Sequence, residues 1–231
     1  MQMKAIARSL ALAAIASGAS LAHAGTVDWA DWTSTTQSTV DGAVLVGATS
    51  VGVSYSGAQY SFAQINNGGF NYWQSPSTPY VSATVSNAPS TSDMVGLNAG
   101  GTSVITFSQA VVNPLIAFVS WNGANVTFGG GADTQTYDIQ YLSSGCGYWG
   151  CGTYGSPTSD SFTGSGELHG VIELLGTYSM ISFTDTTPEY WHGLTVGIEG
   201  GIASTVPEPG NMPLMVAGLG IVGLLLRRRP S

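Results

Sequence analysis

Apolar and polar residues alternate along much of the chain between residues 25 and 200. In QTYDIQY, residues 135–141, the side chains of Tyr137, Ile139 and Tyr141 fall on one face and polar side chains fall on the other. A period of two residues is typical of a half-buried β-strand. The same alternation predicts strands in three further stretches, residues 102–108, 178–184 and 193–199.

LIAFVSW, residues 115–121, is apolar on both faces, which is typical of a central strand. Clusters of Gly, Asn, Pro and Ser separate the apolar stretches and indicate turns. We expect about nine to twelve short strands, packed as an all-β, antiparallel β-sandwich of jelly-roll type over residues 25–200. Further strands are predicted at residues 43–48, 51–56, 59–65 and 81–85.

The charged residues are distributed very unevenly. The five basic residues lie near the two ends, at Lys4, Arg8, Arg227, Arg228 and Arg229. Residues 25–205 hold twelve acidic residues (thirteen less Glu208) and no lysine or arginine, a formal net charge of −12. This charge argues against binding of nucleic acid or of an anionic lipid surface. Expected partners are neutral, cationic or bridged by metal ions.

The N-terminal segment has the organisation of a secretory signal peptide. Two basic residues precede an apolar run over residues 9–16, and small residues lead to Ala22, His23 and Ala24. This order predicts a signal-peptide helix over residues 1–24, with cleavage between Ala24 and Gly25. An uncleaved membrane anchor is the alternative.

The C-terminal segment predicts a membrane helix. Residues 212–226 form an apolar run of fifteen residues, which is shorter than the roughly 20 residues that usually span a bilayer. Local bilayer thinning and snorkelling of the arginines that follow, residues 227–229, can make up the difference. These arginines would stay in the cytoplasm and leave the body outside, with residues 201–205 as a linker.

Val206, Pro207, Glu208 and Pro209 precede this helix and the terminal arginines. Residues 206–231 therefore resemble the PEP-CTERM sorting signal of exported proteins in Gram-negative bacteria. The resemblance implies transient anchoring in the inner membrane, and removal of the tail by exosortase, a membrane-embedded cysteine transpeptidase. It also implies a surface or matrix protein that works with exopolysaccharide in biofilms. A linker followed by a plain tail anchor is the alternative.

The body contains two cysteines, Cys146 and Cys151, in CGYWGC. In an exported protein such a pair predicts a disulfide that closes a six-residue loop. A redox pair usually has the spacing C-x-x-C instead. The disulfide would fix the shape of a loop that carries Tyr148 and Trp149.

No catalytic site is predicted. Histidine lies near a carboxylate in two places, His169 with Glu173 and His192 with Glu189. On a strand, the first pair would be about 13 Å apart, which is too far for joint action. Known nucleophile and metalloprotease motifs are missing from the sequence, so half-buried histidines at strand ends are the favoured interpretation. A secreted hydrolase remains the last of the alternatives.

Exposed aromatic residues are the favoured candidates for binding. Trp73 and the pair Tyr148 and Trp149 lie in turn-like sequence and predict contacts with a glycan, whereas Trp29 and Trp121 are expected in the core. Asp93 or Asp133 could ligate calcium, but the D-x-D-x-D-G pattern is missing, so no metal or cofactor is predicted. The first hypothesis is a non-enzymatic surface or matrix protein that partners exosortase, the secretion machinery and polysaccharide. A secreted carbohydrate-binding module is the alternative.

Overall fold

The computed structural model describes residues 24–57, 60–130, 133–199 and 201–202. The predicted signal peptide up to His23, the sorting motif, the apolar C-terminal helix and the arginine cluster lie outside the described residues. Within the described part of the chain, no helix has the length and apolar character needed to span a bilayer.

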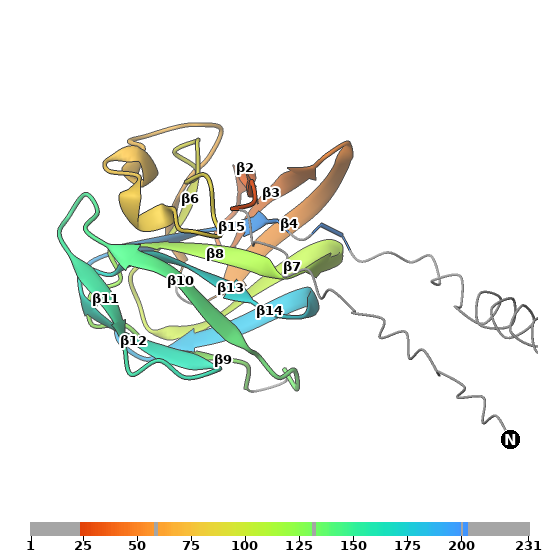
Figure 1. The fold of residues 1–231 in the computed structure, drawn as a ribbon. Helices are drawn as coiled ribbons and strands as arrows, with labels where there is room; N and C mark the ends of the chain where they lie inside the picture. The colour runs from red at the N-terminus through yellow and green to blue at the C-terminus, as the bar shows by residue number, and fades with distance from the viewer. Residues whose placement is uncertain (1–23, 58–59, 131–132, 200, 203–231) are drawn as a thin grey trace, which may run out of the picture.

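Two antiparallel sheets make up the body, which confirms the predicted β-sandwich (Figure 1). The first sheet has the order β10-β13-β8-β15-β6-β5, with β1 paired to β15. Its strands are β1 (Asp28–Trp29), β5 (Tyr60–Gln64), β6 (Met94–Leu97), β8 (Pro114–Val119), β10 (Ile139–Gly145), β13 (His169–Leu174) and β15 (His192–Ile198).

The second sheet has the order β11-β12-β9-β14-β7-β4-β3-β2. Its strands are β2 (Asp31–Thr35), β3 (Thr39–Val46), β4 (Thr49–Gly57), β7 (Gly101–Val112), β9 (Asn125–Phe128), β11 (Gly152–Gly155), β12 (Ser161–Gly166) and β14 (Thr177–Asp185). From β6 onward the chain crosses to the other sheet after each strand, except that β11 and β12 form a hairpin. The crossing loops gather at the two ends of the sandwich.

Three of the alternating stretches, residues 102–108, 178–184 and 193–199, form strands as predicted, apart from the last residue of the third, whereas in residues 135–141 the strand begins only at Ile139. Ile105 and Phe107 on β7, and Ile181 and Phe183 on β14, are buried between the sheets. The prediction for residues 81–85 is wrong, because Val85 makes only an isolated bridge, to Gly25, and the neighbouring residues belong to no strand.

Strand β8 is buried at every position, as its two apolar faces predict. Ile116 and Phe118 pack in the core between the sheets. Leu115 and Val119 belong to a second apolar cluster on the other face. The segment between β5 and β6, drawn in orange and yellow in Figure 1, covers this face with η1 (Tyr72–Gln74) and η2 (Thr78–Tyr80), which contribute Trp73 and Tyr80 to the cluster.

The prediction of a linker from residue 201 onward begins too early. The backbone N–H of Val112 donates to the carbonyl oxygen of Gly201 at 3.0 Å, and Ile202 pairs with Val111. This pairing fixes both residues against the end of β7, so the folded body extends at least to Ile202.

Candidate functional site

The pairing of the first sheet brings four chain segments to one end of the sandwich. Because β13 and β15 both run antiparallel to β8, the starts of these two strands lie beside the end of β8, with Gly170 opposite Phe118 and Gly193 opposite Val119. Likewise, the end of β10 lies beside the start of β13, with Gly145 opposite His169. The loops after β8 and β10 therefore meet the loops before β13 and β15.

Five aromatic side chains form one continuous surface at this end, which we call the aromatic surface: Phe70, Tyr72, Tyr148, Trp149 and Trp191. Ring centroids are 4.8 Å apart for Phe70 and Tyr148, 5.2 Å for Tyr72 and Trp191, and 6.1 Å for Trp149 and Trp191. Trp149 is 50% exposed, and Phe70 and Tyr148 are each 46% exposed. Such a group of exposed aromatic side chains is typical of a surface that binds something.

The disulfide between Cys146 and Cys151 is present as predicted, and it carries Tyr148 and Trp149 into this surface. Gly147 lies so close to the ring of His169 that any larger side chain would collide with it. Gly150 has a φ of +152°, which disfavours other residues. The two glycines thus let the short loop fold back against β13 and expose its aromatic residues.

The prediction for Trp73 as a glycan contact is wrong. Its side chain is completely buried, its Nε1–H donates to the carbonyl oxygen of Asp93 at 3.1 Å, and its ring packs edge-on against Tyr80. Trp73 covers the outer face of β8 because that strand is apolar on both sides. Trp121 is buried as predicted, whereas Trp29 is half-buried.

A cleft of about 400 Å³ lies beside the aromatic surface. Its walls include Trp149, Tyr190 and Trp191, and its polar lining residues are Ser120, Asn122, Glu167 and Glu189. Its volume is within the range of small-molecule sites. Sequence reasoning did not identify this cleft, because its residues come from four separate loops.

Glu167 is fixed in the cleft by two hydrogen bonds. The hydroxyl of Ser120 donates to its Oε2 at 2.6 Å, and the side-chain amide of Asn122 donates to its Oε1 at 3.0 Å. Ser120 has a φ of +59°, an unusual value for a residue with a side chain. Ser120 and Asn122 lie in this turn after β8, and both donate to Glu167 from there.

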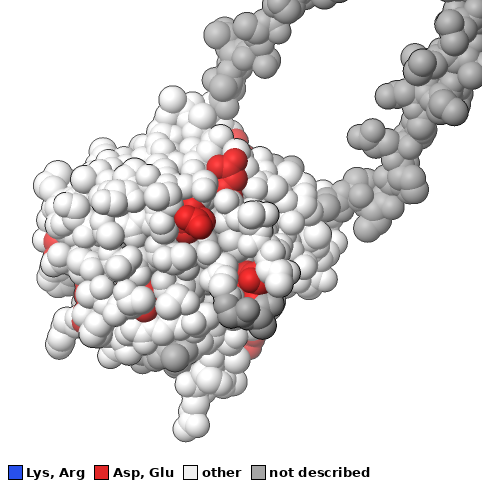
Figure 2. All heavy atoms as spheres, turned by 90° about the horizontal axis from the view of Figure 1, so that it is seen from below, with Lys and Arg blue, Asp and Glu red and all other residues white. Residues whose placement is uncertain are grey.

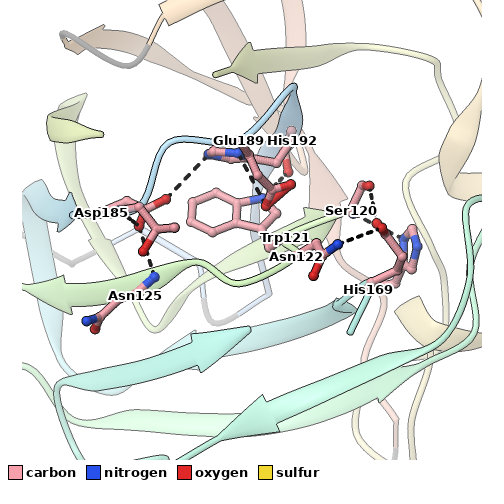
Figure 3. A network of polar contacts seen from close by, with 11 residues as sticks. Ser120, Trp121, Asn122, Asn125, His169, Asp185, Glu189 and His192 are labelled. Carbon is pink, nitrogen blue, oxygen red and sulfur yellow. Dashed lines mark hydrogen bonds and ion pairs between the residues drawn. The ribbon is translucent and has the colours of Figure 1, made fainter. Parts of the chain in front are cut away.

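A second carboxyl group, that of Glu189, lines the same cleft and continues into a buried chain of polar groups (Figure 3). Nδ1 of His192 lies 3.8 Å from Oε1 of Glu189, and its Nε2 lies 3.7 Å from Oδ2 of Asp185. Burial, together with the nearby charge of Glu167, raises the pKa of Glu189 to about 8. Burial lowers the pKa of His192 to about 4, so these contacts do not join full charges at neutral pH.

His169 lies behind the cleft and is also fully buried. Its Nδ1 is 3.0 Å from the hydroxyl of Tyr80 and accepts a long hydrogen bond, 3.4 Å, from the backbone N–H of Ser120. The hydroxyl of Ser120 donates to Glu167 instead, so the histidine does not activate it as a nucleophile. Both histidines begin strands, as predicted, but they are fully buried instead of half-buried.

The two carboxylates considered as calcium ligands accept hydrogen bonds from the protein. Asp93 accepts from the backbone N–H groups of Trp32 and Asn67, at 3.1 and 2.7 Å. Asp133 accepts from the hydroxyls of Tyr137 and Ser182, at 2.6 Å each. Among the described residues, no group of three or more His, Cys, Asp or Glu side chains could hold a metal ion.

Among the described residues, the charged side chains at the surface are all acidic. On the face shown in Figure 2, acidic side chains are scattered among uncharged residues, and no basic residue appears among the described atoms. The carboxylates of the cleft therefore have no basic side chain from the described body to pair with.

No protein-family model matches the chain, and neither a curated protein nor a solved structure matches it.

Proposed function

We propose that this protein is exported, processed at its C-terminus by exosortase, and works at the cell surface or in the extracellular matrix by binding polysaccharide. The observation that carries the binding part is the aromatic surface beside the cleft. Flat, exposed aromatic rings can stack on sugar rings, and the neighbouring polar groups can hydrogen-bond to hydroxyls. The resemblance of residues 206–231 to a sorting signal supports the export part.

We also infer that the sandwich is a jelly roll, in support of this function. The order β6-β15-β8-β13 in one sheet and β7-β14-β9-β12 in the other is the order that two nested Greek keys produce. Lectin domains are among the proteins with this architecture. Because a fold does not assign a function, this likeness supports the proposal only alongside the aromatic surface.

Binding can be tested by pull-down of the full-length protein with extracellular polysaccharide. The variant Trp149→Ala should bind about tenfold more weakly, because it removes a large stacking face. Leu45→Ala is the matched control, since Leu45 is 61% exposed and lies outside the aromatic surface. Equal binding by wild-type protein and Trp149→Ala would contradict the proposal.

The sorting part can be tested separately by mass spectrometry of the protein from cells that contain an exosortase. The mature protein should lack residues 1–24 and the tail after the Pro-Glu-Pro motif. Finding residues 227–231 still attached would contradict processing by exosortase.

A further inference from the structure

The cleft beside the aromatic surface has walls of two chemical kinds. Trp149, Tyr190 and Trp191 offer aromatic faces, while Glu167 and Glu189 offer carboxyl groups. Carboxylates next to aromatic faces attract cations twice, through the negative charge and through the ring quadrupole. A wholly neutral ligand would use only part of this lining.

Glu189 lines the cleft with a side chain that is only 12% exposed, and its Oε1 faces the buried His192 without a hydrogen-bond partner among the described residues. The backbone of Asn122 lies close enough to this carboxyl group to lower its pKa, and the side chain of Asn122 donates to Glu167, so one residue lies beside both acids. A positively charged donor between them would favour the ionised form of Glu189 and lower its pKa.

The composition of the whole body favours a ligand that brings its own positive charge. Residues 25–205 contain no lysine or arginine, so the partner for these acids must come from outside the body. The surrounding negative charge would also raise the local concentration of a cation and the rate of its binding.

On the basis of the polysaccharide binding proposed above, we propose that this cleft recognises an amino sugar whose amino group is protonated, with the ammonium group between Glu167 and Glu189 and the sugar ring against Trp149. The ammonium group provides three hydrogen-bond donors and the positive charge that the cleft lacks. The ring supplies the flat, partly apolar face that a small amine does not have. The proposed ligand is thus a cationic saccharide.

The test compares three oligosaccharides of equal length with full-length protein: glucosamine, its fully N-acetylated counterpart, and glucose. At about pH 6, where a sugar amino group is protonated, the glucosamine oligosaccharide should bind about tenfold more tightly than the other two. This preference should shrink in high salt. Glu167→Gln should abolish the preference, because the amide has nearly the same shape as the carboxylate but carries no charge. Glu189→Gln, which resembles the protonated acid, should reduce the preference less, because at this pH Glu189 ionises only beside the bound ammonium group.

Two control variants separate the cleft from the general charge of the body. Asp138→Asn removes one exposed negative charge elsewhere and should keep the preference, whereas Trp149→Ala should weaken binding of all three oligosaccharides. Thermal unfolding of each variant checks that the fold is intact.

Several outcomes would overturn the inference. Equal binding of charged and acetylated oligosaccharides through Trp149 would refute it and leave the proposed function standing. A preference that survives Glu167→Gln, or equally tight binding of the polyamine spermine, would also refute it. Failure of all three oligosaccharides to bind would also refute the inference, whereas the pull-down with extracellular polysaccharide decides the proposed binding function separately.

Discussion

Trp73 lies in a turn-like stretch, FNYWQS, and is nevertheless completely buried. The backbone around it is irregular, as the sequence predicts, but the residue covers an apolar sheet face that no local pattern reveals. Tyr148 and Trp149 lie in a similar stretch and are exposed. The difference arises because Trp73 packs on the apolar outer face of β8, whereas the loop with Tyr148 and Trp149 lies at the end of the sandwich.

Trp73→Ala should therefore be strongly destabilising. Loss of a large buried side chain leaves a cavity against β8 and removes the hydrogen bond to Asp93, which together should lower the free energy of unfolding by about 3–5 kcal/mol. Chemical denaturation measures this quantity. A variant with unchanged stability and weakened polysaccharide binding would show that Trp73 is exposed after all.

Glu189 should make stability depend on pH. Its pKa is about 8 in the folded protein and near 4.5 in the unfolded chain, so the folded state holds the extra proton between these values. Stability from this group is therefore highest below about pH 4.5 and is lost as the pH rises through 8. Burial also raises the pKa of Asp185, so this group likewise contributes stability at low pH that is lost as the pH rises. Burial lowers the pKa of His192, so this group instead reduces stability at low pH.

Glu189→Gln should remove the loss of stability at high pH, since glutamine resembles the protonated acid and cannot ionise. We expect the variant to match wild-type protein near pH 5 and to be more stable near pH 9, by on the order of 1–2 kcal/mol. Unfolding curves across this pH range test the expectation. A variant that is less stable than wild-type protein at pH 9 would contradict it.

At the scale of elements, the strands that alternate strictly were predictable from the sequence, and so was the central strand β8. Residues 81–85 were not, although VSATV is rich in β-branched residues, because the segment covers a sheet instead of joining one. Strands β11 and β12 consist mainly of small and polar residues, without a regular alternation of apolar and polar positions. Their pairing depends on the neighbouring β9, which sequence patterns do not show.

The disulfide loop between β10 and β11 is expected to matter more for binding than for stability. A ring of six residues restricts the unfolded chain only modestly, which corresponds to about 2 kcal/mol. The double variant Cys146→Ser, Cys151→Ser should therefore remain folded but bind polysaccharide several-fold more weakly, because Trp149 is no longer held in place. Thermal unfolding and pull-down, measured together, test this. Full binding by the folded variant would show that the disulfide does not position Trp149.

At the scale of the whole molecule, the candidate site could not be predicted. The sequence pointed to Tyr148 and Trp149, but Phe70, Glu167 and Trp191 reach the same end of the sandwich only through the order and direction of the strands. The two aromatic residues between Glu189 and His192, in EYWHG, were a visible signal of this site. Only pairing across the whole sheet places that segment beside the disulfide loop.

The charge distribution of the whole chain leads to a prediction about its mature form. Cleavage after Ala24 would free the α-amino group of Gly25, and the body would then gain a positive charge although it has no lysine or arginine. The carboxyl group of Glu199 packs directly against the Cα atom of Gly25, and burial raises the pKa of Glu199. A new ammonium group here would favour the ionised carboxylate and bring its pKa down.

A protein that begins at Gly25 should thus be more stable than one that retains His23 and Ala24, by at most about 1 kcal/mol because the pair is partly exposed. The difference should shrink in high salt and vanish in Glu199→Gln, which keeps the shape but not the charge. Thermal unfolding of the four proteins forms a double-mutant cycle. If the stability difference persists in Glu199→Gln, the new N-terminus acts through something other than this carboxylate, and the mature body does not use its processed end as a counter-ion.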